Sequence, residues 1–189
     1  MTLEIKKYGT PVLRQKGARV EKITPELKQL VADMLETMRS AKGVGLAAQQ
    51  VGVVAQVAVI DVRAVTDRPS SMEVEGKKVN PEDYMPLVLI NPEITPTGEK
   101  VQGPEGCLSF PEIFGDVIRP ATIDVRTLNQ EGIEFRFSCG GLLARAIQHE
   151  ADHLNGILFI DRMVLTDKEE IKPQLDELQA KTKKKLKMG

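Results

Sequence analysis

The sequence predicts an α+β fold in which an antiparallel or mixed sheet wraps around one central helix. An apolar helical pattern from Leu142 to Leu154 contains the only two histidines of the chain. Several segments between residues 53 and 137 are rich in β-branched residues or alternate apolar with polar residues, which is typical of strands. The last two of these segments are separated by a short turn and not by a helix, so they favour antiparallel pairing.

Composition bounds the class of protein. The chain has 189 residues, a net charge of −1 and 41% hydrophobic residues, which suits one ordinary globular catalytic or binding domain. The bulk charge gives no argument for DNA binding, and no apolar run is long enough to span a membrane or to act as a signal peptide. We therefore expect a protein that stays in the compartment where it is made, without a membrane partner.

The first half of the chain begins with an irregular lead-in over residues 1–23. Thr24 and Pro25 then supply an N-cap and a first-turn proline, and Gly43 ends the helix that follows. Apolar residues recur along this helix at helical spacing: Leu27, Leu30, Val31, Met34, Leu35 and Met38. The small residues of Gly43–Gly52, GVGLAAQQVG, let the backbone pass close to another element or to a substrate.

The second half supplies most of the sheet. Residues 53–60 and 87–90 are predicted as buried strands, the second ending at Asn91 and Pro92. Residues 63–86 between them are polar and are predicted as an insertion loop containing at most a short hairpin. Residues 122–128 and 133–137 alternate apolar with polar residues around the turn at 129–132, which predicts an antiparallel hairpin.

The C-terminal residues 166–189 are predicted as a helical, lysine-rich tail that follows a single catalytic domain of residues 1–165. Ile171, Leu175 and Leu178 give the tail a narrow apolar stripe, and its last nine residues, KTKKKLKMG, include five lysines. A solvated helix end is one interpretation of this charge. The other is a ribosome-docking element that contacts RNA phosphates.

The histidine-bearing helix carries the strongest chemical signal. His149 and His153 are four residues apart, so both side chains lie on one helix face and can share one metal ion. Glu150 lies beside them and can accept a proton from a water held by that ion. This H-E-x-x-H pattern is typical of metal-assisted hydrolysis. The alternative is a buried helix whose histidines are merely core residues.

A catalytic metal site needs a third protein ligand, and the residues leave three alternatives open. Cys107, in the glycine-containing stretch EGCLS, could supply a thiolate. A downstream carboxylate such as Asp161 would instead favour a peptidase. A closed structural zinc site would need a fourth ligand, for which Cys139 is the remaining cysteine.

Three separated motifs in this order resemble peptide deformylase: GVGLAAQQ at residues 43–50, EGCLS at 105–109 and QHEADH at 148–153. The resemblance runs from about Tyr8 to Asp161. It implies a metal-dependent hydrolase that removes the formyl group from the N-terminal formyl-methionine of newly made proteins and releases formate. One departure is Gln49, where the family most often has proline, which we expect to leave the neighbouring loop less rigid.

The resemblance also implies roles for individual residues. Cys107, His149 and His153 would hold one divalent ion with water as the fourth ligand, and Glu150 would be the general base. The Gln50 amide and the Leu108 N–H would stabilise the oxyanion. The residues expected to bind the substrate are Val44, Gly45, Gly106 and Leu142. As a weaker expectation, Asp152 pairs with Arg119 and fixes the helix against the Cys107 loop.

The donor set of one thiolate and two imidazoles suits Zn²⁺ or Fe²⁺. The resemblance favours Fe²⁺, with Zn²⁺, Ni²⁺ or Co²⁺ as alternatives. The partners it implies are N-formyl-methionyl nascent peptides and, through the lysine-rich tail, the ribosome.

Overall fold

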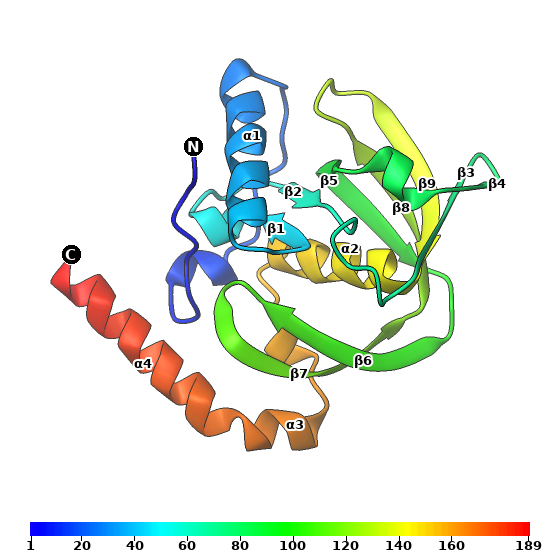
Figure 1. The fold of residues 1–189 in the computed structure, drawn as a ribbon. Coiled ribbons are helices and arrows are strands. Elements are labelled where there is room, and N and C mark those ends of the chain that lie inside the picture. Colours follow the sequence, from blue (N-terminus) through cyan, green and yellow to red (C-terminus); the bar gives the residue numbers. More distant parts are fainter.

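The computed structural model describes residues 1–189 and contains one large sheet, one two-stranded sheet and four α-helices (Figure 1). The large sheet has seven strands in the order β1-β2-β5-β8-β9-β3-β4, and every pair of neighbours is antiparallel. The strands of this sheet are β1 (Gly45–Ala47), β2 (Val57–Ile60), β3 (Ser70–Val74), β4 (Lys77–Val79), β5 (Leu87–Pro96), β8 (Thr122–Leu128) and β9 (Glu134–Gly140). The second sheet pairs β6 (Lys100–Cys107) with β7 (Phe110–Pro120). The predicted α+β class is confirmed.

Helix α2 (Gly141–Leu154) lies at the centre, with the large sheet on one side and the β6–β7 hairpin on the other (Figure 1). It begins directly after β9, so the chain must turn sharply where the strand becomes a helix. Gly141 makes this turn at a φ of +67°, and a Cβ there would lie 2.2 Å from the Pro69 carbonyl oxygen. Only glycine suits both the conformation and the space.

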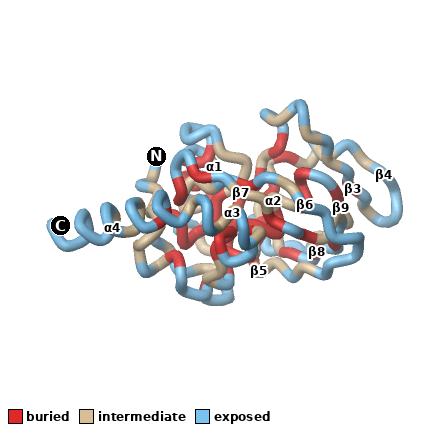
Figure 2. Tube along the Cα trace, turned by 90° about the horizontal axis from the view of Figure 1, so that it is seen from below, coloured by how far each residue is buried: buried red, intermediate tan, exposed pale blue.

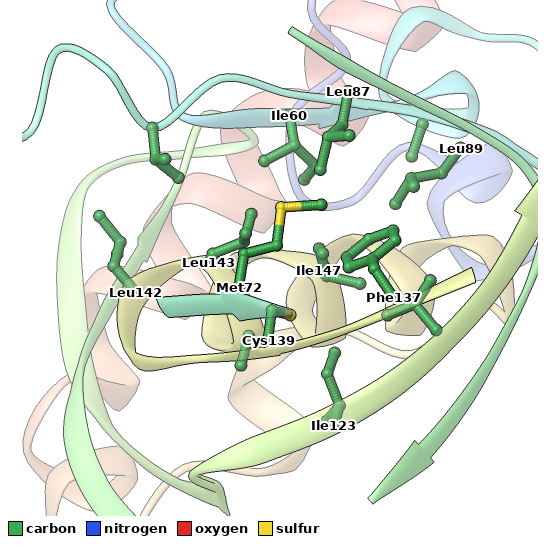
Figure 3. Close-up of a cluster of buried hydrophobic side chains, with 14 of the residues drawn as sticks. Ile60, Met72, Leu87, Leu89, Ile123, Phe137, Cys139, Leu142, Leu143 and Ile147 are labelled. Carbon is green, nitrogen blue, oxygen red and sulfur yellow. The ribbon is translucent and has the colours of Figure 1, made fainter. Parts of the chain in front are cut away.

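The main core lies between α2 and the sheet. Figure 3 shows Leu142, Leu143 and Ile147 of α2 among side chains of five strands. The labelled strand residues are Ile60, Met72, Leu87, Leu89, Ile123, Phe137 and Cys139. Because the sheet side chains pack on this one face of α2, the opposite face is left for His149 and Glu150, which line a cleft.

Helix α1 (Pro25–Ser40) packs on β1 and β2 through a separate cluster that includes Val31, Met34 and Met38. Thr24 caps it by accepting a hydrogen bond from the Leu27 N–H at 3.2 Å, as the sequence predicts. After β1 the chain forms the short 3-10 helix η2 (Ala48–Val51), which places Gln50 beside the site. A further 3-10 helix, η1 (Pro11–Arg14), lies within the lead-in.

Two predicted strand boundaries are wrong. Residues 53–56 precede β2 and lie against the lead-in, where Ala18 bridges Ala55. The strand that begins at Leu87 does not end at Asn91 but continues to Pro96 across a bulge. Asn91 adopts a φ of +51°, and its side chain exchanges two hydrogen bonds with the Val20 backbone. Asparagine tolerates this left-handed conformation, so the residue bulges the strand instead of terminating it.

The predicted hairpin of residues 122–137 is confirmed as β8 and β9, and β9 extends further to Gly140. The short hairpin considered for the segment 63–86 is present as β3 and β4, and the segment also joins the large sheet. Its strand β3 pairs with β9 and buries Met72 in the main core, while β4 forms the outer edge of the sheet. The 3-10 helix η3 (Pro81–Tyr84) completes the segment before β5.

The chain after α2 passes through η4 (Phe159–Asp161) and α3 (Leu165–Glu170) into the long helix α4 (Lys172–Met188). Leu175 anchors α4 in a second core formed mainly by β7 and η4. The far end of α4 projects past the body of the protein and is exposed along its length (Figure 2). None of the helices combines the length and the apolar character needed to cross a membrane.

Candidate active site

Three predicted ligands meet at one point between α2 and the end of β6. The thiol of Cys107 and one imidazole nitrogen each of His149 and His153 lie within 4.8 Å of one another. Cys107 Sγ is 3.3 Å from His153 Nε2. A thiolate and two imidazoles that converge in this way could hold a metal ion, and three protein ligands are the number typical of catalytic zinc sites.

Glu105 holds the first of these histidines from behind. Its Oε1 lies 2.8 Å from His149 Nδ1, so the other ring nitrogen is the one free to face the Cys107 thiol. A carboxylate on the far nitrogen of a ligating histidine fixes the ring and makes it a stronger ligand. The sequence analysis missed this role of Glu105, because no spacing rule connects it with a residue 44 positions later.

Glu105 is itself held by two arginines. Arg119 donates to both of its carboxylate oxygens, at 2.6 and 2.9 Å, and Arg145 donates to Oε2 at 2.8 Å. Burial opposes ionisation of Glu105, but His149 and Arg119 outweigh it and hold the carboxyl pKa well below its usual range. Glu105 therefore remains an anion beside the metal ligands.

The same arginine connects the Cys107 loop to the metal helix. Arg119 donates to Asp152 at 2.8 Å, so the expected pairing of these residues is confirmed. Asp152 also receives two bonds from Arg162, at 2.6 and 2.9 Å. The ion pairs run from β6 through β7 to α2, which fixes the two elements that carry the three ligands.

The two histidines differ in their protonation. Burial drives the pKa of His153 well below its usual value, and a neutral imidazole is the form that binds metal. Burial also opposes the charged form of His149, but the contacts with Cys107 and Glu105 outweigh it and raise its pKa well above the usual value. His149 therefore has to release a ring proton when it binds a metal ion, because the proton and the ion compete for the same nitrogen.

Glu150 lies fully enclosed against β1. Burial raises the pKa of its carboxyl to about 7, and its Oε2 has no hydrogen-bond partner within the protein. A Cβ on Gly45 would lie 2.5 Å from Oε1 of Glu150, so glycine at this position leaves the room that the carboxylate needs. A buried carboxyl without a protein partner beside a metal-ligand cluster can accept and return a proton.

Gln50 lies on the other side of the cysteine. Its Oε1 accepts from the Ala47 N–H at 3.0 Å, which orients the amide so that Nε2 points to Ser109 Oγ at 3.1 Å and Cys107 Sγ at 3.5 Å. The preceding Gln49 is completely buried and donates to the Gln15 and Leu154 carbonyls, both at 3.3 Å. These bonds tie the turn to the lead-in and to the end of α2, and the lower rigidity expected of glutamine relative to proline stays a prediction.

A cleft of about 580 Å³ opens over these groups. Nine of the ten predicted site residues line it, and the tenth, His153, is buried: the nine are Val44, Gly45, Gln50, Gly106, Cys107, Leu108, Leu142, His149 and Glu150. Val44 and Leu142 provide apolar wall next to the metal ligands. Gly106 lies under the ring of Phe114, whose atoms would be 2.7 Å from a Cβ at that position.

Lys7 is a further residue of the site that the sequence analysis missed. It lines the cleft, and its ammonium group donates to the Leu108 carbonyl oxygen at 2.7 Å. The neighbouring Tyr8 N–H donates to the Ser109 carbonyl at 3.0 Å. The N-terminal segment thus restrains the loop that follows Cys107, and only the contact between residues far apart in sequence reveals it.

The other candidate ligands lie elsewhere. Asp161 is engaged by Arg14 and by the Leu158 N–H. Cys139 is buried in the main core, where burial raises the pKa of its thiol to about 12. Neither belongs to the cluster around His149 and His153, which removes the basis for a downstream carboxylate ligand or a fourth cysteine ligand.

Comparison with known proteins agrees with this geometry. The family model of polypeptide deformylase matches residues 2–169. A peptide deformylase of Methylacidiphilum infernorum is 47% identical over 178 residues, covering 94% of this chain and 93% of the relative. A peptide deformylase of Opitutus terrae is 48% identical over 165 residues, covering 86% and 85%.

Solved structures show the same fold. Peptide deformylase from Plasmodium falciparum superposes with a TM-score of 0.82 at 34% identity, covering 95% of this chain and 96% of the other. The enzyme from Synechococcus elongatus, crystallised with actinonin, gives a TM-score of 0.75 at 41% identity over 95% and 85% of the two chains. On this evidence the chain belongs to the polypeptide deformylase family and is a metal-dependent hydrolase that removes the N-formyl group from newly made proteins.

Proposed function

We propose that Cys107, His149 and His153 hold one divalent metal ion, and that this ion is Fe²⁺. The convergence of their three ligand atoms within 4.8 Å carries the proposal. Their chemistry suits the ion, because one thiolate and two neutral imidazoles bind Fe²⁺ or Zn²⁺ readily. The preference for iron over Zn²⁺, Ni²⁺ or Co²⁺ rests on the family resemblance.

Bound there, the ion would polarise the formyl oxygen and favour ionisation of a water molecule. Glu150 takes a proton from that water while the water oxygen attacks the formyl carbon. The Gln50 amide and the Leu108 N–H donate to the oxyanion that forms on the former carbonyl oxygen. Glu150 then returns the proton to the departing amine, so the C–N bond breaks and the products are formate and a free N-terminus.

The cleft supports binding of formyl-methionine in particular. The methionine side chain packs against Val44 and Leu142, and the peptide backbone bonds to the backbones of Val44, Gly45 and Gly106. A formyl carbon carries only hydrogen, whereas an acetyl group adds a methyl. The narrow space between Glu150, Gln50 and the cysteine loop excludes that methyl sterically.

Metal content tests the ligand assignment. Protein purified without oxygen in the presence of Fe²⁺ is expected to contain one ion per chain by elemental analysis. Cys107→Ala is expected to lose most of it, and Cys139→Ala, the matched control at the only other cysteine, to retain it. Full occupancy in Cys107→Ala would overturn the assignment.

We also propose that residues 1–165 are the catalytic domain, working in the bacterial cytoplasm, and that residues 166–189 are a tail that docks on the ribosome. The end of α4 is basic and exposed, and no acid pairs with four of its lysines. These lysines are Lys181, Lys183, Lys184 and Lys187. Lysines on a projecting helix can contact RNA phosphates, and such binding weakens with added salt.

Cosedimentation with ribosomes tests the docking. Deleting residues 181–189 is expected to abolish it, and four phosphate contacts predict that log K falls with log salt at a slope of roughly −3. Replacing Lys77 and Lys78 of the exposed strand β4 by alanine is the control and should leave cosedimentation intact. Unchanged cosedimentation of the truncated chain would refute the docking.

A further inference from the structure

The charges at the mouth of the cleft suggest which formylated chains this enzyme prefers. Three cationic side chains line the cleft besides Arg145, which Glu105 neutralises: Lys7, Lys42 and Arg68. The ammonium group of Lys7 donates a hydrogen bond to the Leu108 carbonyl oxygen. The side chains of Lys42 and Arg68 make neither a salt bridge nor a hydrogen bond in the protein, so their charges are available to a ligand.

The acids that line the cleft do not cancel this charge. Glu105 is paired with Arg119, Arg145 and His149, and Glu150 is buried at the base of the site. Glu112 is the one exposed acid of the lining, and it lies on β7. The lining therefore contains two unpaired cations, Lys42 and Arg68, against one exposed acid, Glu112.

The two free cations flank the apolar residues of the cleft. Lys42 directly precedes Gly43 and Val44. Arg68 precedes Pro69, whose carbonyl accepts from the Leu142 N–H at the start of α2. Each of the two residues expected to contact the methionine side chain thus has a cation nearby in the protein chain. Lys42 is two residues before Val44, and Arg68 precedes the Pro69 that bonds to Leu142. Lys42 and Arg68 line the same cleft as these two apolar residues, so a residue that follows methionine can come within reach of their charges.

From this arrangement we propose that Lys42 and Arg68 form a selectivity rim that favours substrates with an acidic side chain at the second or third residue. The proposal rests on the deformylase function and specifies its substrate class. A solvent-exposed ion pair contributes about a 1.4- to 5-fold effect for each cation. Both cations attract a glutamate of the substrate and repel a lysine. The kcat/KM of the glutamate substrate is therefore predicted to exceed that of the lysine substrate by roughly threefold or more.

Matched peptides measure this preference. The substrates are two series of amides, formyl-Met-X-Ala-Ala and formyl-Met-Ala-X-Ala, with X as Glu, Gln or Lys, so that one side-chain charge varies at the second or at the third residue. The expected order of kcat/KM is Glu above Gln above Lys at low ionic strength. The Glu-to-Lys ratio should shrink as salt rises from about 0.05 M to about 0.5 M, because the charges are exposed and salt screens them.

Charge reversal identifies the rim. In Lys42→Glu/Arg68→Glu the Glu-to-Lys ratio is expected to fall to one or below. Two control reversals, Lys77→Glu and Lys78→Glu on β4, change the net charge equally outside the cleft and should keep the wild-type ratio. A wild-type ratio of one, or a ratio that the rim variant retains, overturns the proposal. Turnover of the Gln peptide reports the deformylase reaction separately, so its absence would contradict the function itself.

Discussion

Replacing Glu105 by glutamine tests how strongly the buried ion network supports the metal site. The carboxylate takes part in four hydrogen bonds, two with Arg119 and one each with Arg145 and His149. Glutamine keeps one acceptor oxygen and turns an NH2 group toward these donors. Disrupting one partner of a buried ion pair costs about 3–5 kcal/mol, which lowers Tm by roughly 6–20 °C in a chain of this size.

The same substitution acts on the metal. Losing the carboxylate behind a ligating histidine weakens metal binding by about 10- to 100-fold. Thermal unfolding and competition with a chelator measure the two effects, and Glu112→Gln on the exposed face of β7 is the control. Because the pKa of Glu105 lies far below its usual value, its contribution to stability is fully present above the ordinary carboxyl pKa and is lost progressively as pH falls from there toward the lowered value. Wild-type Tm and metal affinity in Glu105→Gln would refute this reasoning.

Three further predictions follow from burial and backbone geometry. Burial raises the pKa of Glu150 to about 7, so kcat/KM should rise with pH toward that value and then level off. A bound cation shifts this rise to lower pH. A flat profile from about pH 4 to about pH 9 would contradict the assignment of Glu150 as the base. Leu143→Ala should reduce the free energy of unfolding by about 2–5 kcal/mol in urea, against almost no change for the exposed Leu186→Ala; equal effects would contradict the packing. Gly141→Ala should lower Tm far more than Gly76→Ala. Both glycines have a positive φ, but only a Cβ added at Gly141 would lie within 3 Å of another atom, Pro69 O. Comparable Tm values for the two variants would argue against this clash.

Local sequence signals predicted the elements whose cause is local. The N-cap at Thr24 and the spacing of Met34 and Met38 define α1 because both depend on residues within one or two turns. The pair His149 and His153 behaves likewise, since a four-residue spacing fixes one helix face. The family resemblance then placed Cys107 beside them, which spacing alone left open.

Features that depend on distant partners escaped the sequence analysis. Asn91 looks like the end of a strand, yet two bonds with Val20 hold it in a bulge and β5 continues. Met72 lies in a polar segment, and its role in the core appears only because β3 pairs with β9. Glu105 and Lys7 acquire their roles from contacts with His149 and the Leu108 carbonyl, and no pattern in the chain predicts such pairs.

The most direct test of the catalytic site compares formate release and metal content in wild type and Glu150→Gln. The substrate is a short formyl-methionyl peptide, with the acetyl-methionyl peptide as the control. We predict one bound ion in both proteins, turnover of the formyl peptide alone by the wild type, and a loss of at least about 100-fold in the variant. Wild-type turnover by Glu150→Gln with its metal in place would contradict the assignment of Glu150 as the base.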